Sequence, residues 1–392
     1  MVSFFNQKNI FSVLLLVWVI SIPFKNAIYQ GSTIFLIIFF LVYIIKNKDY
    51  GNLKILFYKY KDLFTAFSLI ILSMTISNIL NDVSKTEAWH LEFSYIYRYA
   101  FIFIVLIYFY SKDFFSKQML IIFIFTTLGI QGLDGVFQSI IGYDIFKHNI
   151  GDLSQGLSGA TFNRNIFGFF MGIGVILSFF LIKKDEILNK INLIFISFFV
   201  IFIFSTLFSF SRAVWVSVFI SFVLYFILNY KKINIKHIIG VSIICISLIL
   251  IFLNIDLLQN RFEQLLMGET SLRDTIWINT TNLIKEKMFF GWGVDTWQIY
   301  GLKEFAGIHN ITLEILFYMG FFGLFSFIIF LGLIVKEIFS IKNYEVLSFI
   351  IFMLIVGQFD HSIITGKTYL ATMTILMFFV FMNRIDKKEI NR

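Results

Sequence analysis

Four basic side chains in this sequence stand beside residues of the types that cap helix N-termini. The pairs are Asn163 with Arg164, Ser211 with Arg212, Ser271 with Arg273, and Asn310 with His309. A helix N-terminus presents unpaired backbone N–H groups and a partial positive charge, so an arginine added to it makes a strong site for an anion. Repetition of this pattern predicts a pocket for a polyanion, and a diphosphate is the natural candidate.

The residue type strengthens this interpretation, because a guanidinium grips phosphate with two hydrogen bonds whereas lysine acts as a point charge. The alternative is that such arginines only reach out to lipid headgroups. Arg212 fits that alternative least well, since two apolar runs, 191–209 and 211–229, leave almost no loop around it. We therefore expect Arg212 to lie in a tight turn, where its desolvation needs an accompanying anion or acid. Arg164 fits the anion site less firmly.

His309 is the candidate general base. An imidazole can take a proton from a hydroxyl near neutral pH, and His309 directly precedes an expected helix at Asn310. Asp360 falls at the end of another apolar run and could orient His309 or an arginine. It could equally serve only to neutralise an arginine.

Several motifs are absent from the sequence. It has no Asp-x-Asp cluster, no zinc-type spacing of His and Cys, no phosphate-binding Gly-x-x-x-x-Gly-Lys motif, and a single cysteine, Cys245. We therefore expect no metal and no cofactor. A phosphate leaving group would have to be stabilised by arginines and helix dipoles.

The elements that must position these residues are membrane spans. Of the 392 residues 58% are hydrophobic and only 14% charged, whereas a soluble globule carries about 25% charged residues. Since a span needs about 20 apolar residues, the sequence predicts an all-α, polytopic membrane protein with about twelve transmembrane helices. The expected spans are 10–24, 27–45, 63–80, 94–110, 118–141, 161–182, 191–209, 211–229, 238–254, 310–335, 345–360 and 368–384.

The distribution of basic residues predicts the orientation. An even number of spans places both termini on one side, and most lysines then fall in cytoplasmic segments, as the positive-inside rule requires. The net charge of +8 is then explained by cytoplasmic lysines, which set the topology and lie against anionic lipid. No nucleic-acid partner is needed to explain it. The outer side then holds five of the seven arginines: Arg98, Arg164, Arg212, Arg261 and Arg273.

We expect one membrane domain, 1–392, with one long outer segment, 255–309, between the ninth and tenth spans. Within that segment Ser271 and Asp274 have the spacing of a capping box, which places Arg273 at the second or third position of a helix. A stripe at helical spacing follows, formed by Ile276, Trp277, Thr280, Leu283 and Ile284. We expect this helix to lie along the membrane surface.

These motifs resemble the O-antigen ligase family of bacterial inner-membrane glycosyltransferases, which also includes many polysaccharide polymerases. The resemblance runs from about residue 155 to 365 and rests on five motifs. They are Gly159-Ala-Thr-Phe-Asn-Arg-Asn165, Phe208-Ser-Phe-Ser-Arg-Ala-Val-Trp215, Ser271-Leu-Arg-Asp-Thr-Ile-Trp277, Phe290-Gly-Trp-Gly293, and His309-Asn-Ile-Thr-Leu-Glu-Ile-Leu316 followed by Gly320-Phe-Phe-Gly323.

The resemblance implies a GT-C-like glycosyltransferase of the bacterial inner membrane with a periplasmic active site. Such an enzyme takes a glycan from undecaprenyl diphosphate and joins it to lipid A–core. The family's functional residues match Arg212, Arg273 and His309, and its acid after the eleventh span matches Asp360. Arg164 and Asn310 are expected to help bind substrate. A proline usual before the Gly-x-Gly motif is replaced around Met288, which we expect to alter the turn more than the chemistry.

Two alternatives stay open. A polysaccharide polymerase would use the same donor chemistry with another acceptor, and the motifs do not separate it from a ligase. A flippase for a lipid-linked saccharide would also need arginines for the diphosphate. We expect a flippase to place charges near the bilayer midplane, whereas the middles of the expected spans are nearly free of charge, apart from Asp134 in the fifth.

Overall fold

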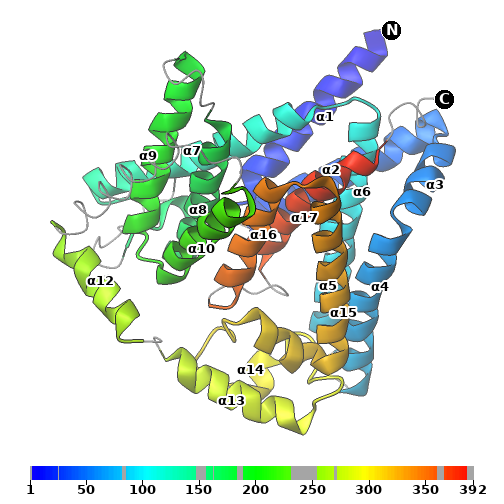
Figure 1. The fold of residues 1–392 in the computed structure, drawn as a ribbon. Helices are drawn as coiled ribbons and strands as arrows, with labels where there is room; N and C mark the ends of the chain where they lie inside the picture. Colours follow the sequence, from blue (N-terminus) through cyan, green and yellow to red (C-terminus); the bar gives the residue numbers. More distant parts are fainter. Residues whose placement is uncertain are drawn as a thin grey trace. The chain divides into compact units, whose positions relative to one another are not determined.

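The computed structural model describes residues 2–24, 26–81, 85–146, 156–161, 163–182, 189–230, 254–268, 272–359 and 366–385 (Figure 1). Its elements are helices, and the prediction of an all-helical polytopic membrane protein is confirmed. Seven of the described helices are long and apolar enough to cross a membrane, and shorter apolar helices add Gln7–Ser21, Arg212–Leu228 and Tyr344–Gly357. The expected span 238–254 lies almost wholly outside the described residues, so the number twelve stays a prediction.

The chain divides into two compact units. The first unit contains residues 1–124, 272–346 and 357–392, and the second contains residues 125–271 and 347–356. The prediction of one domain over 1–392 is not tested by this division.

The first unit begins with an antiparallel helix pair. The helices of its N-terminal part are α1 (Val2–Ser21), α2 (Asn26–Asn47), α3 (Tyr50–Lys59), α4 (Lys61–Leu80), α5 (Lys85–Tyr95), the π-helix η1 (Ile96–Ala100) and α6 (Phe101–Ser111). Helix α1 ends two residues before Pro23, which lacks the N–H that a continuing helix needs. The indole N–H of Trp18 then donates to the Thr33 hydroxyl at 3.2 Å and joins α1 to α2.

The rest of the first unit packs against α4. It contains α13 (Arg273–Glu286), α14 (Trp297–Tyr300), α15 (Ile311–Ile341), α17 (Lys367–Phe381) and the 3-10 turn η5 (Met382–Arg384). Helices α4 and α15 lie side by side (Figure 1), and the Ser77 hydroxyl donates to the Tyr318 carbonyl at 2.6 Å. Beyond α17, Arg384 donates to Asp62 at 2.8 Å and to Glu337 at 2.7 Å.

The second unit is held together by glycines that admit large rings. It contains most of α7 (Lys117–Ile141) and α16 (Tyr344–Gly357), together with the 3-10 turn η3 (Gly159–Thr161), α8 (Arg164–Leu181), α9 (Lys190–Phe208), α10 (Arg212–Leu228) and α12 (Asp256–Leu266). A Cβ at Gly174 of α8 would lie 2.7 Å from the Phe202 ring, and a Cβ at Gly172 would lie 2.7 Å from Phe352. Small residues thus let these helices approach closely, as they do in membrane proteins generally.

Polar side chains on α7 fix the loop before α8. The Gln138 side-chain oxygen accepts the backbone N–H groups of Ser158 at 3.0 Å and Gly159 at 2.9 Å. A buried carboxylate on the same face, Asp134, accepts the N–H of Ile145 at 2.7 Å. The charged residue that sequence analysis noted within a span therefore organises a loop.

Candidate functional site

Arg164 is the first residue of α8, as the pairing with Asn163 predicted. The Asn163 side chain accepts the N–H groups of Asn165 at 2.8 Å and Ile166 at 3.3 Å. Asn163 itself has an extended backbone, and its side chain satisfies two of the helix's first N–H groups. The cap therefore fixes where α8 begins and makes Arg164 its first residue.

Arg212 is the first residue of α10 and follows α9 after only three residues. Phe210, within that turn, has a φ of 53° in the left-handed region, which a bulky residue adopts only where packing demands it. Ser211 occupies the N-cap position of α10 as predicted, but its hydroxyl makes no capping hydrogen bond. The Ser209 hydroxyl instead accepts the N–H of Ser211 at 3.3 Å and donates to the Thr206 carbonyl at 2.7 Å.

The starts of α8 and α10 come together in the second unit. Gly168 lies one turn beyond Arg164, and a Cβ there would sit 2.6 Å from the Ser209 hydroxyl and 3.1 Å from the Ser211 Cβ. The turn that carries Arg212 is therefore seated on the first turns of α8. Sequence analysis proposed these two arginines for one pocket, and the structure brings together the helix ends that carry them.

A third guanidinium reaches the same turn. Arg261 of α12 lies over the Phe210 ring, 5.8 Å from its centroid, and donates to the Gln264 side chain at 3.0 Å. In the sequence Arg261 is marked only as one of the outer arginines, because no cap or motif accompanies it. Its placement depends on a contact across more than forty residues, which local spacing does not reveal.

Arg273 is the first residue of α13, one or two positions earlier than predicted. The preceding Leu272 has a φ of 66°, so the helix cannot extend back through it. Ser271, the expected cap, lies outside the described residues. The predicted stripe is confirmed, since Ile276, Thr280 and Ile284 are buried.

His309 sits between two anchored neighbours. The indole N–H of Trp277, one turn beyond Arg273 on α13, donates to the Ile308 carbonyl at 3.1 Å. On the other side, the Asn310 side chain caps α15 by accepting the Leu313 N–H at 2.9 Å, as predicted. The backbone of His309 itself has a φ of 54°, a value that histidine tolerates better than bulkier residues do.

Asn310 also links α15 to the end of α16. Its side-chain N–H donates to the Gln358 carbonyl at 3.1 Å, and the Thr312 hydroxyl donates to the Gln358 side chain at the same distance. Asp360 follows two residues later but lies outside the described residues, so its proposed role beside His309 is untested. The first unit thus joins the first turns of α13, which begin at Arg273, to the residue before His309.

Two glycine motifs that carry the resemblance form one structure, which we call the glycine clasp (residues 288–293 with 317–322). Helix α15 breaks at Gly320, with φ 63° and ψ −161°, and so leaves helix N–H and carbonyl groups without their usual partners. The clasp supplies new ones. Trp292 N–H donates to the Phe317 carbonyl at 2.7 Å, and Phe321 N–H donates to the Met288 carbonyl at 2.8 Å.

Only glycine fits at the centre of the clasp. A Cβ at Gly320 would lie 2.3 Å from the Phe289 carbonyl carbon, and one at Gly291 would lie 2.5 Å from that of Tyr318. Both contacts are with backbone, which cannot rotate away as a side chain can. The clasp therefore joins the end of α13 to α15, the two helices whose starts carry Arg273 and His309.

A polar network then fastens the clasp to α4. Asn81 donates to the Gly291 carbonyl at 2.9 Å, and Asn78 accepts the Val294 N–H at 2.8 Å. Asn78 also donates to the buried carboxylate of Glu92 at 3.2 Å. Among the described residues, no group of three or more His, Cys, Asp or Glu side chains could hold a metal ion.

Comparison with known proteins gives a family for the middle of the chain. Residues 197–328 match the family model described as O-Antigen ligase. That segment, about a third of the chain, contains Arg212, Arg273, His309, Asn310 and both halves of the glycine clasp. No curated protein matches the sequence. The predicted resemblance is thus confirmed over residues 197–328, which are similar to the O-antigen ligase family.

Proposed function

We propose that the protein is an O-antigen ligase that transfers a glycan from undecaprenyl diphosphate to lipid A–core at the periplasmic face of the bacterial inner membrane. The observation that carries this proposal is that Arg164, Arg212 and Arg273 are each the first residue of a helix. Guanidinium groups at helix N-termini are suited to a diphosphate. Two of the three, with His309, fall within the family match.

In the proposed mechanism Arg212 and Arg273 bind the diphosphate and stabilise the charge that develops as it leaves. His309 takes the proton from the acceptor hydroxyl, whose oxygen attacks the anomeric carbon. The new glycosidic bond forms as the bond to the diphosphate oxygen breaks, with inversion at the anomeric carbon. The two electrons of the broken bond stay on undecaprenyl diphosphate, and the arginines and helix N-termini stabilise the resulting charge.

The other candidate residues have supporting roles in this proposal. Arg164 contributes a further guanidinium to the donor phosphates. Asn310 holds the helix start behind His309 through its bonds to Leu313 and Gln358. Asp360 orients His309 or balances an arginine. Both termini are proposed to lie in the cytoplasm.

The test is a transfer assay with purified protein, lipid-linked glycan and lipid A–core, without metal or nucleotide. We expect Arg212→Lys to lose at least about 100-fold in rate, because the charge remains but the bidentate fork is lost. His309→Ala should lose about 100-fold to 10,000-fold.

Matched controls are Arg384→Lys, at an arginine paired with Asp62 and Glu337, and His90→Ala, at an exposed histidine. Both controls should transfer at nearly the wild-type rate. Wild-type rates for Arg212→Lys would refute the diphosphate role.

The acceptor separates a ligase from a polymerase. A strain that lacks this protein should still make lipid-linked polymer while its lipid A–core stays bare. If the strain instead accumulates single lipid-linked repeats, the protein is a polymerase and the acceptor proposed here is wrong.

A further inference from the structure

Trp292 lies in the glycine clasp, and its neighbours fix its side chain. Its indole N–H donates to the Leu283 carbonyl at 2.8 Å, and its backbone N–H donates to the Phe317 carbonyl at 2.7 Å. The Lys287 ammonium lies 4.2 Å from the centroid of its ring and also donates to the Asn81 side chain. A cation over an indole is attracted by the electrons of the ring. These contacts hold the indole in one orientation.

Tyr300 packs its ring against this fixed indole. The two ring centroids are 4.6 Å apart, and the ring planes are tilted by 38°. Aromatic pairs at such a distance attract each other beyond the area that they bury. Tyr300 is the last residue of the short helix α14 and is 40% exposed, whereas Trp297, the first residue of that helix, is only 2% exposed. Tyr300 thus presents at the surface a ring that Trp292 holds in place.

The loop after α14 closes back on that helix. The Trp297 indole N–H donates to the Phe305 carbonyl at 2.9 Å, and the Gln298 side chain donates to the same carbonyl at 3.2 Å. His309, the candidate general base, follows four residues after Phe305. One short segment, 297–309, therefore carries both the exposed ring and His309.

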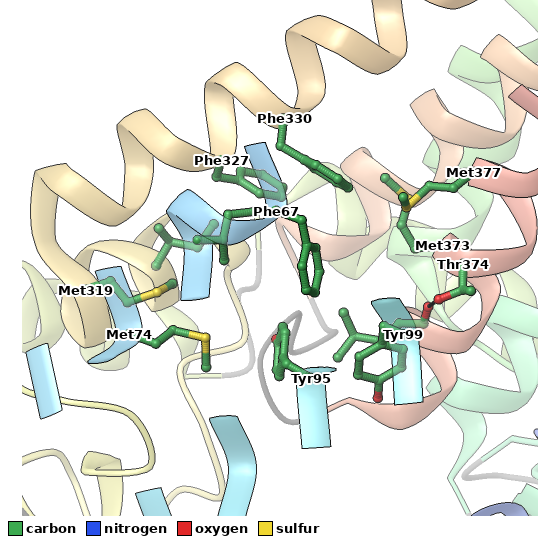
Figure 2. Close-up of a pocket in the computed structure, with 13 residues that line it drawn as sticks. Phe67, Met74, Tyr95, Tyr99, Met319, Phe327, Phe330, Met373, Thr374 and Met377 are labelled. Carbon is green, nitrogen blue, oxygen red and sulfur yellow. Dashed lines mark hydrogen bonds between the residues drawn. The ribbon is translucent and has the colours of Figure 1, made fainter. Parts of the chain in front are cut away.

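The first unit also contains an apolar cavity, which does not suit a sugar. It lies between α4, α5, η1, α15 and α17 and has a volume of about 60 Å³, whereas ligand pockets usually have about 300–1,000 Å³. Figure 2 shows Phe67, Phe330 and Met74 in its lining, side chains that offer no strong hydrogen bond to a hydroxyl. A sugar is better received at the surface beside Tyr300.

An exposed aromatic ring with hydrogen-bonding groups in the same segment suits a pyranose sugar. The C–H bonds on one face of such a sugar carry partial positive charge, so they are attracted to the negative face of an aromatic ring. The hydroxyl groups at the edge of the sugar need donors and acceptors. Gln298, Lys303 and Glu304 are exposed in the segment that carries Tyr300 and can supply both.

We propose that Tyr300, backed by Trp292, is a stacking platform for a pyranose ring, either of the glycan that is transferred or of the oligosaccharide that receives it. This inference rests on the proposed function and adds a binding group to it that lies outside the arginines and His309. The platform holds the sugar and takes no part in the chemical step. Its loss therefore raises the KM for one of the two glycans and leaves kcat nearly unchanged.

Binding of lipid-free oligosaccharides to the purified protein tests the platform directly. The two probes are the core oligosaccharide released from lipid A and the repeat oligosaccharide released from undecaprenyl diphosphate, and an NMR saturation-transfer titration measures the binding of each. We expect Tyr300→Ala to bind one probe about tenfold more weakly than wild type. The probe that loses affinity identifies whether the acceptor or the donor sugar stacks on the ring.

Four further variants isolate the ring. Tyr300→Phe keeps the ring and should bind like wild type. Tyr300→Leu keeps an apolar contact with Trp292 but has no aromatic face, so it should lose affinity as Tyr300→Ala does, and it serves if Tyr300→Ala does not fold. Two controls should bind normally: Ile299→Ala, at a 52% exposed apolar residue of the same helix, and Tyr58→Ala, at a 73% exposed tyrosine that also lies beneath a lysine.

The proposal is overturned if wild type binds neither probe, or if Tyr300→Ala and Tyr300→Leu bind both probes as wild type does. It is also overturned if Tyr300→Phe loses as much affinity as Tyr300→Ala, since phenylalanine keeps the ring. An equal loss in Ile299→Ala would overturn it as well, because α14 would then act only as an apolar surface, as residues at a membrane interface do.

Transfer kinetics separate this proposal from the proposed function. If wild type binds an oligosaccharide but transfers no glycan, the proposed function is wrong and the platform stands. If wild type transfers glycan and Tyr300→Ala changes the KM of neither substrate, the platform is wrong and the proposed function stands.

Discussion

The two units hold their candidate residues by different means. In the second unit, Arg164 and Arg212 start helices whose first turns touch directly through Gly168 and Ser209. In the first unit, His309 is held by Trp277 on one side and by Asn310 on the other, and the helices behind it are joined by the glycine clasp. One arrangement depends on a short turn, and the other on backbone bonds between distant segments.

The difference indicates which groups can tolerate change. A binding charge at a helix start acts through its position and the helix dipole, so a small shift weakens it gradually. A general base must meet one hydroxyl in one geometry, and a displacement of about 1 Å can cost about 100-fold in rate. We therefore expect substitutions behind His309 to reduce kcat, and substitutions behind Arg212 to raise the KM for the donor.

The largest effect should come from Gly320→Ala. The added Cβ meets the Phe289 carbonyl carbon at 2.3 Å, and the backbone at Gly320 has a conformation that alanine avoids. We expect a loss of more than about 3 kcal/mol in unfolding free energy, or failure to fold. Thermal unfolding in detergent measures this loss.

Gly332→Ala on the same helix is the control for Gly320→Ala, since no atom lies within 4 Å of its Cβ position. It should be as stable as wild type or slightly more so. Equal stability of the two variants would show that the clasp does not hold α15.

Gly168→Ala should have a smaller effect, because its nearest neighbour is the end of a side chain, the Ser209 hydroxyl at 2.6 Å. The hydroxyl can move, but it then gives up its bond to the Ser211 N–H, just before Arg212. We expect about a tenfold rise in the KM for the lipid-linked donor, with a smaller change in kcat. Steady-state transfer kinetics measure both constants.

Removal of the clashing hydroxyl offers a control for Gly168→Ala. In the double variant Gly168→Ala with Ser209→Ala, the KM for the donor should fall part of the way back to the wild-type value. The effects of the two changes would then not be additive. Additive losses would mean that Gly168 acts on Arg212 by another route.

The smallest and most direct comparison uses two tryptophans with equivalent bonds. Trp277 donates its indole N–H to the Ile308 carbonyl at 3.1 Å in the first unit, and Trp215 donates to the Thr206 carbonyl at 2.9 Å in the second. Each change to Phe removes one hydrogen bond worth about 1 kcal/mol, which corresponds to about a fivefold effect. We expect Trp277→Phe to lower kcat and Trp215→Phe to raise the donor KM. Identical kinetic changes in both variants would contradict the division of roles.

Local features of the site could be predicted from the sequence. Asn163 and Asn310 cap their helices as expected, because a cap needs only a side-chain oxygen and an N–H two or three residues away. The buried stripe of α13 followed from helical periodicity for the same reason. Ser211 stands at the N-cap position of α10, but its hydroxyl makes no capping hydrogen bond, and the Ser209 hydroxyl instead accepts the N–H of Ser211 in the turn.

Other features had no local signal. The break of α15 at Gly320 exists because residues 288–293 supply the hydrogen bonds that the interrupted helix lacks. The sequence of the helix alone does not predict this break. The contact between Arg261 and Phe210 and the burial of Arg98 likewise depend on helices that are distant in sequence. The two glycine motifs could be found in the sequence, but their spacing did not indicate that they contact each other in the clasp.

The sequence alone determined that this is a helical membrane protein with three arginines, Arg164, Arg212 and Arg273, at helix starts, because apolar length, charge placement and capping act over a few residues. Only the tertiary structure decided that α13 and α15 are joined through backbone at two glycines, and that Arg98 lies buried among tyrosines. The physical reason is that close approach and desolvation are set by the neighbours a residue meets across the fold, and those neighbours are not encoded in its own segment.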